Sequence, residues 1–84
     1  MPNVLRIGPY RFFFWSRENN EPAHVHVQRD KMEAKFWLVP IVELAGNWGF
    51  APHELNRVLQ LVIDHRDELL EAWHEHFDEE SDNA

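Results

Sequence analysis

The chain contains no cysteine, which excludes disulfide bonds, thiolate zinc sites and cysteine nucleophiles at once. A metal ion would therefore need histidine and carboxylate ligands. Serine is nearly absent as well, because Ser16 and Ser81 are the only two and neither is placed as an obvious nucleophile.

Long hydrophobic runs are missing too. No stretch approaches the roughly 18 apolar residues that a membrane-spanning helix needs. The first residues, MPNVLRIG, lack the basic segment followed by an apolar run that marks a secretion signal. We therefore expect a soluble cytoplasmic protein with no membrane partner.

Apolar residues nevertheless make up 44% of the 84 residues and aromatic residues 13%, far above the profile of a disordered chain. We expect a single α+β domain over residues 1–77, followed by a disordered acidic tail over residues 78–84. A domain of this size buries only about 60% of its unfolded surface, so a partner or a second copy of the chain is expected to add stability.

The formal net charge of −7 is distributed unevenly along the chain. Residues 1–42 carry six basic and four acidic residues, whereas residues 43–84 carry two basic and eleven acidic ones. An acidic total argues against strong nonspecific binding to nucleic acid, but the amino-terminal half can still present a local basic face.

The first half of the sequence shows the short alternating runs that are typical of β-strands. Strands are expected over residues 4–7, 10–16, 23–28 and 33–38, with a polar loop over residues 17–22. Gly8-Pro9 and the segment 29–31 are expected to form turns. The run 41–44 is either a short edge strand or irregular chain.

A regular apolar stripe in the second half predicts one long helix. It follows a turn-rich segment over residues 46–52, and Pro52 suits its first position because the proline N–H is not needed there. The stripe is formed by Leu55, Val58, Leu59, Val62, Leu69, Leu70, Trp73 and Phe77. The predicted fold is an antiparallel sheet of four to five strands packed on this single C-terminal helix.

Alternate strand residues point to opposite sides, so the side chains can be sorted into two sheet faces. The apolar face, which should contact the helix, holds Tyr10, Phe12, Phe14, Val25, Val27, Ala34, Phe36 and Leu38. The other face mixes polar and aromatic side chains and holds Arg11, Phe13, Trp15, His24, His26, Gln28, Lys35 and Trp37. Such a density of aromatic residues is unusual at an exposed surface, so we expect something to cover this face.

The mixed face indicates two kinds of partner. Aromatic residues and arginine are enriched in protein interfaces, while RNA bases stack on tryptophan with a contribution of about 1 to 3 kcal/mol per base. We rank a protein partner, or a homodimer, ahead of RNA. The candidate ligand or partner residues are Arg11, Trp15, Gln28, Lys35 and Trp37.

His24 and His26 are neighbours on the mixed face and are the candidate catalytic residues. Histidine titrates near neutral pH, so either could act as acid or base on RNA or another phosphoester, with Arg11 and Lys35 holding the phosphate. With Glu21 as a third ligand, the same pair could instead hold a divalent metal ion.

The alternative for this pair is purely structural. Two partly exposed strand histidines would then simply bond to their neighbours. The spacing alone decides nothing, because His74 and His76 repeat it on the predicted helix, where two such residues lie about 200° apart.

Three motifs occur in order along the chain. They are Glu21-Pro22-x-His24-Val25-His26-Val27, then Ala34-Lys35-Phe36-Trp37-Leu38, then a helix with Glu54-Leu55 near its start and Leu69-Leu70 and Trp73 near its end. In these motifs the chain resembles a family of small bacterial proteins known as a domain of unknown function. Such proteins are often encoded beside another small domain, in pairs that resemble toxin-antitoxin systems. The resemblance implies a protein partner from an adjacent gene and a toxin-like role that acts on RNA.

Overall fold

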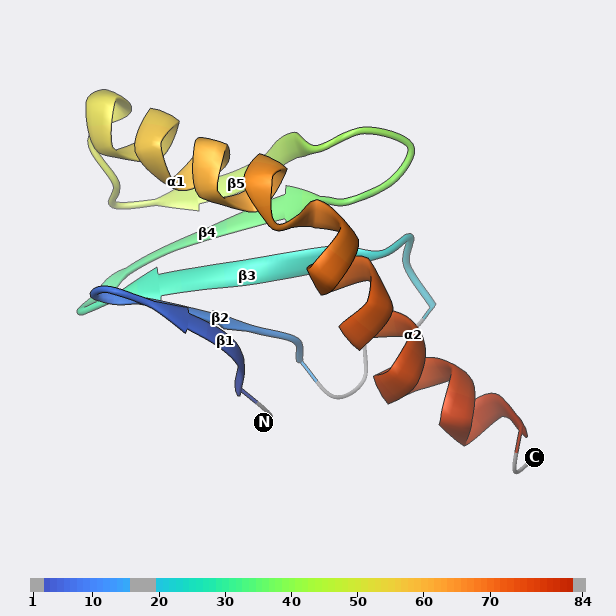
Figure 1. Cartoon of the computed structure of the whole chain (residues 1–84). Helices are drawn as coiled ribbons and strands as arrows, with labels where there is room; N and C mark the ends of the chain where they lie inside the picture. The colour runs from blue at the N-terminus through green and yellow to red at the C-terminus, as the bar shows by residue number, and fades with distance from the viewer. Residues whose placement is uncertain (1–2, 16–19, 83–84) are drawn as a thin grey trace.

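A computed structural model describes residues 3–15 and 20–82 and folds them into one sheet backed by helices (Figure 1). The strands are β1 (Asn3–Ile7), β2 (Tyr10–Phe13), β3 (His24–Arg29), β4 (Met32–Trp37) and β5 (Glu43–Trp48). The helices are α1 (Pro52–Asp64) and α2 (Arg66–Asp82). Each strand pairs antiparallel with the next, so the strand order in space is the order along the chain. The predicted α+β class and the antiparallel sheet are confirmed.

Tight turns fix the pairing of β1 with β2 and of β3 with β4. Gly8-Pro9 joins β1 to β2, and Asp30-Lys31 joins β3 to β4. The first residue of each turn has a positive φ, 56° at Gly8 and 54° at Asp30. A positive φ there matches the twist of the flanking strands, and glycine and aspartate adopt it most readily. Both predicted turns are confirmed, whereas the predicted loop over residues 17–22 lies partly outside the described residues.

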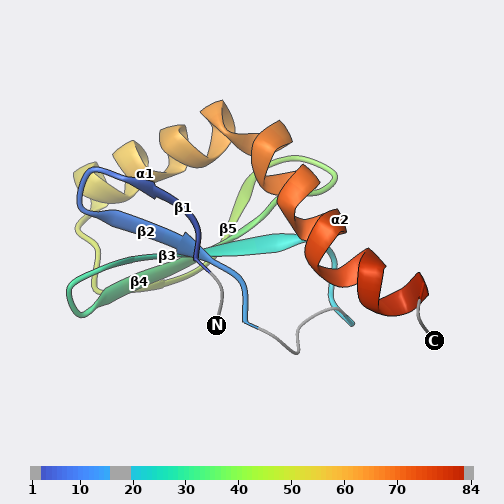
Figure 2. The ribbon, with the colours of Figure 1, turned by 60° about the horizontal axis from the view of Figure 1, so that its bottom comes forward.

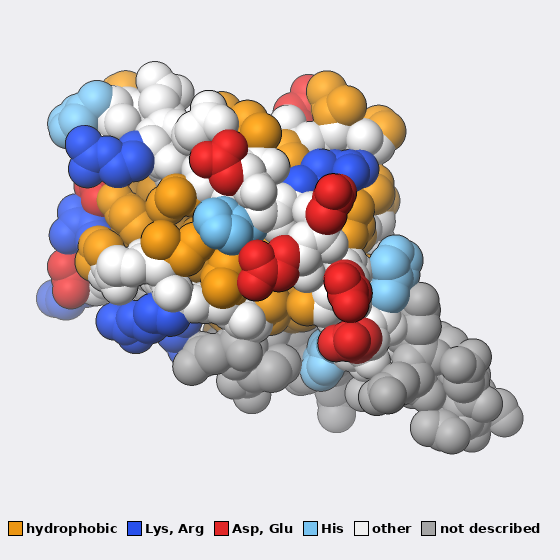
Figure 3. All heavy atoms as spheres, viewed as in Figure 1, with side chains coloured by type: hydrophobic (Ala, Val, Ile, Leu, Met, Phe, Trp, Pro, Cys, Tyr) orange, Lys and Arg blue, Asp and Glu red, His pale blue; other side chains and the backbone are white. Residues whose placement is uncertain are grey.

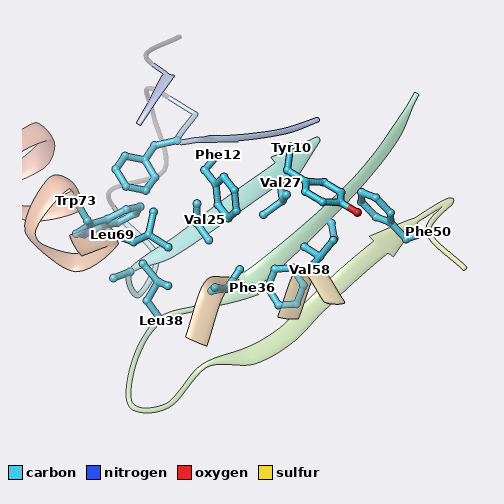
Figure 4. Packing of buried hydrophobic residues seen from close by; sticks show 14 of the residues in the cluster. Tyr10, Phe12, Val25, Val27, Phe36, Leu38, Phe50, Val58, Leu69 and Trp73 are labelled. Carbon is cyan, nitrogen blue, oxygen red and sulfur yellow. The ribbon is translucent and has the colours of Figure 1, made fainter. Parts of the chain in front are cut away.

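Both helices cover the same face of the sheet, and the core lies between these two layers (Figure 2). All of the side chains predicted for the apolar face are buried: Tyr10, Phe12, Phe14, Val25, Val27, Ala34, Phe36 and Leu38. Figure 4 shows several of them, including Phe12, Val25 and Phe36, with Val58, Leu69 and Trp73 of the helices. The buried helix residues of this core are Val58, Val62, Leu69, Trp73 and Phe77. The strand period therefore assigned this face correctly.

The prediction of one long helix is wrong, because the helix breaks at His65. This residue has φ −111° and ψ 17°, and its Nδ1 lies 2.9 Å from the carbonyl oxygen of Leu61. The next residue, Arg66, donates from Nε to the carbonyl oxygen of Leu38 at 2.9 Å, which ties the junction to the end of β4. The break turns α2 across the sheet and past the ends of β2 and β3 (Figure 1).

The backbone of α2 continues to Asp82 and so includes residues 78–82, which the sequence assigned to an acidic tail. α2 holds eight of the fifteen acidic residues of the chain but only one of its eight basic residues. It therefore accounts for the whole formal net charge of −7. No helix in the described ranges 3–15 and 20–82 is long and apolar enough to cross a membrane.

The last strand, β5, reaches further than the sequence indicated. Residues 46–49 were expected to form a turn, but Gly46 pairs with Lys35 and the strand continues to Trp48. Ala45 is an extra residue on β5, since Lys35 pairs with Gly46 and the next residue, Phe36, pairs with Leu44. The expectation of a turn is therefore wrong for residues 46–48, and the edge strand covers residues 43–48 rather than 41–44.

Glu54, in the first turn of α1, ties the helix to the sheet. Its carboxylate accepts two hydrogen bonds from Arg29, from Nε at 2.7 Å and Nη2 at 2.8 Å, and a third from the Tyr10 hydroxyl at 2.7 Å. The Arg29 bonds, followed by the Tyr10 bond, lower the pKa of Glu54 from 4.5 to about 2. The sequence placed Glu54 only near the start of a helix, because a partner 25 residues away cannot be predicted from local spacing.

Acid should weaken the fold through this contact. The pKa of Glu54 is lower in the folded chain than in the unfolded chain, so its contribution is complete above about pH 4.5 and disappears as the pH falls to about 2. We expect Glu54→Gln to be less stable than the wild type at pH 7 and to lose less stability below pH 4.5. Urea unfolding of both proteins at several pH values measures this difference. Parallel stability curves between pH 5 and 2 would show that Glu54 is not linked to folding.

Candidate functional site

The sheet has one face that the helices leave uncovered, which we call the open face (Figure 2). Strand register arranges its side chains in cross-strand rows. The first row is Arg6, Arg11, Gln28, Glu33 and Trp48, the second is Phe13, His26, Lys35 and Gly46, and the third is His24, Trp37 and Glu43. The register thus brings the predicted site residues together on neighbouring strands.

His24 is fully buried, with an exposed fraction of 0%, although the sequence suggested partial exposure. Its ring centroid lies 5.6 Å from that of Trp37 and 5.4 Å from that of His26. On its other side α2 supplies Trp73, whose ring centroid is 5.0 Å away. The Nδ1 atom lies 2.9 Å from the carbonyl oxygen of Pro22, so in a neutral ring Nδ1–H donates and Nε2 carries the lone pair.

His26 is also buried, with an exposed fraction of 4%. Its ring stacks on Phe13 at a centroid distance of 5.4 Å and an angle of 21° between the ring planes. Its Nδ1 lies 3.1 Å from Oε2 of Glu33, which forms a carboxylate–imidazole pair. Such pairs orient histidines that act as a base or as a metal ligand, but they also occur as structural contacts. The geometry fixes the ring orientation, while the burial limits access to it.

The predicted cationic residues of this face both lie against aromatic rings. The Arg11 guanidinium carbon is 4.5 Å from the centroid of the Phe13 ring, and Nζ of Lys35 is 4.6 Å from that of Trp37. Arg11 also donates from Nη2 to the side-chain oxygen of Gln28. These contacts hold the cationic groups of Arg11 and Lys35 against aromatic side chains of the open face.

The three candidate metal ligands are not arranged as a metal site. No group of three histidine or acidic side chains within the described part of the chain could hold a metal ion. Oε1 of Glu21 accepts a hydrogen bond from Lys35 at 2.6 Å and lies 3.9 Å from Nδ1 of His24. Coordination by Glu21, His24 and His26 would compete with the hydrogen bond from Lys35 for the Glu21 carboxylate, whereas His26 could keep Glu33 at Nδ1 and coordinate through Nε2.

Sequence reasoning did not place Trp48, which proves to be the most exposed tryptophan of the open face. Its exposed fraction is 57%, against 43% for Trp15. Its ring lies over Gly46, where an added Cβ would come within 2.5 Å of Cη2. An aromatic ring that covers a glycine of the same edge strand replaces the missing side-chain packing. The Gly46-x-Trp48 spacing, which puts both residues on one strand face, was the available signal.

Charge is separated in space as it is in sequence. Figure 3 shows lysine and arginine side chains gathered at one end of the molecule, over the turns that join β1 to β2 and β3 to β4. Acidic side chains lie over the helical side, where α2 carries most of them. The end of the molecule that holds these two turns is therefore basic, while acidic side chains lie over the helices.

The fold and the open face define a small α+β domain in which a five-stranded antiparallel meander is backed by two helices. Residues 10–74 match the family described as Domain of unknown function (DUF4160), and the chain belongs to this family. The match extends from β2 to His74 in α2, and it confirms the predicted membership of a family of unknown function. No curated protein and no solved structure matches the chain.

Proposed function

We propose that this protein is an interaction module that binds a protein partner along β5. The observation that carries the proposal is the position of the exposed apolar side chains. Trp48 and Leu44 lie on β5, and Ile41, with an exposed fraction of 63%, lies just before it. β5 is the last strand of the sheet order, so one side of its backbone has no neighbouring strand among the residues that the structure describes. An extended segment of a partner can add to such an edge.

A groove beside β5 supports the same site. It has a volume of about 470 Å³ and is lined by Pro40, Ile41, Val42, Ile63 and Arg66. Ile63 is itself exposed, and it comes from α1, so the groove joins the helical layer to the connection that precedes β5. We define the β5 surface as Ile41, Leu44, Trp48 and Ile63. A partner segment paired to β5 would lay an apolar side chain into this groove.

The chemistry of the β5 surface favours protein over RNA. Four exposed apolar side chains lie on or beside this strand, Trp48 on the open face and Leu44 on the face toward the helices, and the acidic Glu43 begins the strand. RNA binding would require cations beside the stacking rings, because phosphate contacts supply most of the affinity. Lys35, the nearest predicted phosphate ligand, is instead bonded to Glu21.

The kind of partner that we propose is a second small protein, as in a toxin-antitoxin pair. The resemblance of the chain to bacterial proteins encoded in such pairs supports this choice. A toxin-like role in the bacterial cytoplasm would then be controlled by the protein that covers β5. His24 and His26 are too deeply buried to support acid–base catalysis as the primary proposal.

Truncating Trp48 should weaken the complex. We expect Trp48→Ala to weaken binding of the adjacent-gene product by about 30-fold or more, because exposed aromatic anchors dominate interface energies. Co-expression followed by calorimetry of the purified components measures this loss. Trp15→Ala is the matched control, since Trp15 is also exposed but does not belong to the β5 surface.

Equal weakening by Trp15→Ala and Trp48→Ala, or no weakening by Trp48→Ala, would exclude the β5 surface as the site. Light scattering of the chain alone gives its oligomeric state. A dimer that Trp48→Ala converts to a monomer would identify the partner as a second copy of this chain.

A further inference from the structure

The opposite edge of the sheet carries a basic pocket, of whose lining residues only Arg11 and Gln28 were candidates from sequence. It has a volume of about 270 Å³ and lies beside the turns that join β1 to β2 and β3 to β4. Its lining residues are Arg6, Pro9, Arg11, Gln28, Arg29 and Asp30. The pocket lies within the basic end of the molecule seen in Figure 3. Because β1 and β5 are at opposite ends of the strand order, this pocket is separate from the β5 surface.

Two of the three arginines face each other across neighbouring strands. Arg6 on β1 and Arg11 on β2 are paired in the strand register. Like charges that are directly opposite in a sheet repel each other, and this arrangement costs stability unless an anion lies between them. Arg6 is exposed, and it has no ion-pair or hydrogen-bond partner among the described residues. An anion in the pocket would reduce the repulsion between Arg6 and Arg11, and it would accept hydrogen bonds from the guanidinium group of Arg6.

The other polar side chains that line the pocket are held in place by hydrogen bonds within the protein. Gln28 accepts a hydrogen bond from Arg11, which leaves its amide N–H groups as donors to a ligand. Arg29 is fixed by two bonds to Glu54, and its Nη1 lies 3.2 Å from Oδ2 of Asp30. The one carboxylate that lines the pocket is thus already paired with a cation.

We propose that this pocket binds a phosphate group. Guanidinium groups match the oxygen geometry of phosphate and can donate two parallel hydrogen bonds to it. Arg6 and Arg11 approach from two strands, so a tetrahedral anion can accept from both, whereas a planar carboxylate offers only two oxygens. The phosphate group is carried either by a small phosphorylated molecule or by the backbone of a nucleic acid. This proposal does not depend on the partner of the β5 surface.

An NMR titration of the ¹⁵N-labelled full chain tests the pocket. Inorganic phosphate added at constant ionic strength should shift the amides of Arg6, Arg11 and Gln28 with saturation. We expect Arg6→Gln to weaken this binding at least about tenfold, as expected for the loss of a charge-assisted hydrogen bond. Lys31→Gln is the matched control, since Lys31 is exposed in the adjacent turn but does not line the pocket. It should change the affinity by no more than about twofold.

The result that would overturn the proposal is a shift that does not saturate, or one that Arg6→Gln and Lys31→Gln weaken equally. Either result would show that phosphate responds only to overall charge. Further titrations with glycerol phosphate and with a short RNA lacking terminal phosphates distinguish the two sources. Binding of both in an Arg6-dependent way assigns the pocket to phosphodiester backbones, and binding of glycerol phosphate alone assigns it to small phosphomonoesters. RNA binding that is unchanged in Arg6→Gln would also contradict the proposal.

Discussion

Trp73→Ala is expected to lower the free energy of unfolding by about 3–5 kcal/mol, the usual cost of truncating a buried large aromatic residue. Trp73 is 6% exposed and joins α2 to β3 and to the residue that follows β2. Its ring packs edge-on against Phe14 at a centroid distance of 5.2 Å, and it also contacts His24 at 5.0 Å. Within α2 it lies 4.2 Å from the Phe77 ring, so removing the indole loosens α2 as well as the sheet.

The loss should be large enough to unfold much of the protein. A domain of 84 residues has a total stability of about 4–13 kcal/mol at ordinary values per residue. Urea unfolding followed by circular dichroism measures the change, and Trp73→Phe gives a milder variant if Trp73→Ala does not fold. Trp48→Ala is the control, because its ring is 57% exposed and its loss should cost less than about 1 kcal/mol. Equal losses at the two tryptophans would show that α2 does not depend on Trp73.

The sheet could be predicted from sequence because each strand alternates with period two. His24-Val25-His26-Val27 is the clearest example, since its valines are buried in the core under the helices and its histidines point to the other face. The period of two did not predict the full length of β5, because a glycine interrupts the alternating pattern of this strand. Gly46 indicated a turn, whereas the structure covers it with the ring of Trp48.

In the sequence, the helix break corresponds only to a gap in the apolar stripe of the predicted helix. The apolar stripe passes from Val62 to Leu69, and the positions where it should continue hold His65 and Arg66. These side chains bond to backbone carbonyl oxygens, Arg66 to that of Leu38, so they end one helix and anchor the next. The Arg66 contact joins residues that are 28 positions apart, and local periodicity contains no information about it.

The candidate site shows the same limit. Alternation grouped Arg11, Gln28, Lys35 and Trp37 with the two histidines, and the register puts them in adjacent rows. Burial could not be predicted, because it depends on how α2 runs after the break. A straight helix leaves the beginning of β3 uncovered, whereas the bent one brings Trp73 against His24.

His24→Ala should therefore act mainly on folding. We expect a loss of about 2–4 kcal/mol in the free energy of unfolding, because the substitution opens a cavity and removes the donor to the carbonyl oxygen of Pro22. His24→Asn keeps a donor near the position of Nδ1, so it should lose less. His53→Ala is the matched control, since His53 is exposed at the start of α1 and its loss should cost less than about 0.5 kcal/mol.

Denaturant unfolding of these three variants separates structure from catalysis at His24. If growth arrest or RNA cleavage is lost in His24→Ala only in proportion to the folded fraction, the histidine is structural. A variant that unfolds at the wild-type urea concentration yet has lost all activity would instead assign His24 a direct chemical role.

The same measurement on His26→Gln tests the pair with Glu33, whose carboxylate lies 3.1 Å from Nδ1 of His26. His26 is buried, and its ring lies against the rings of Phe13 and the more exposed Trp15. A ligand could therefore reach the His26 ring only if Phe13 or Trp15 moved.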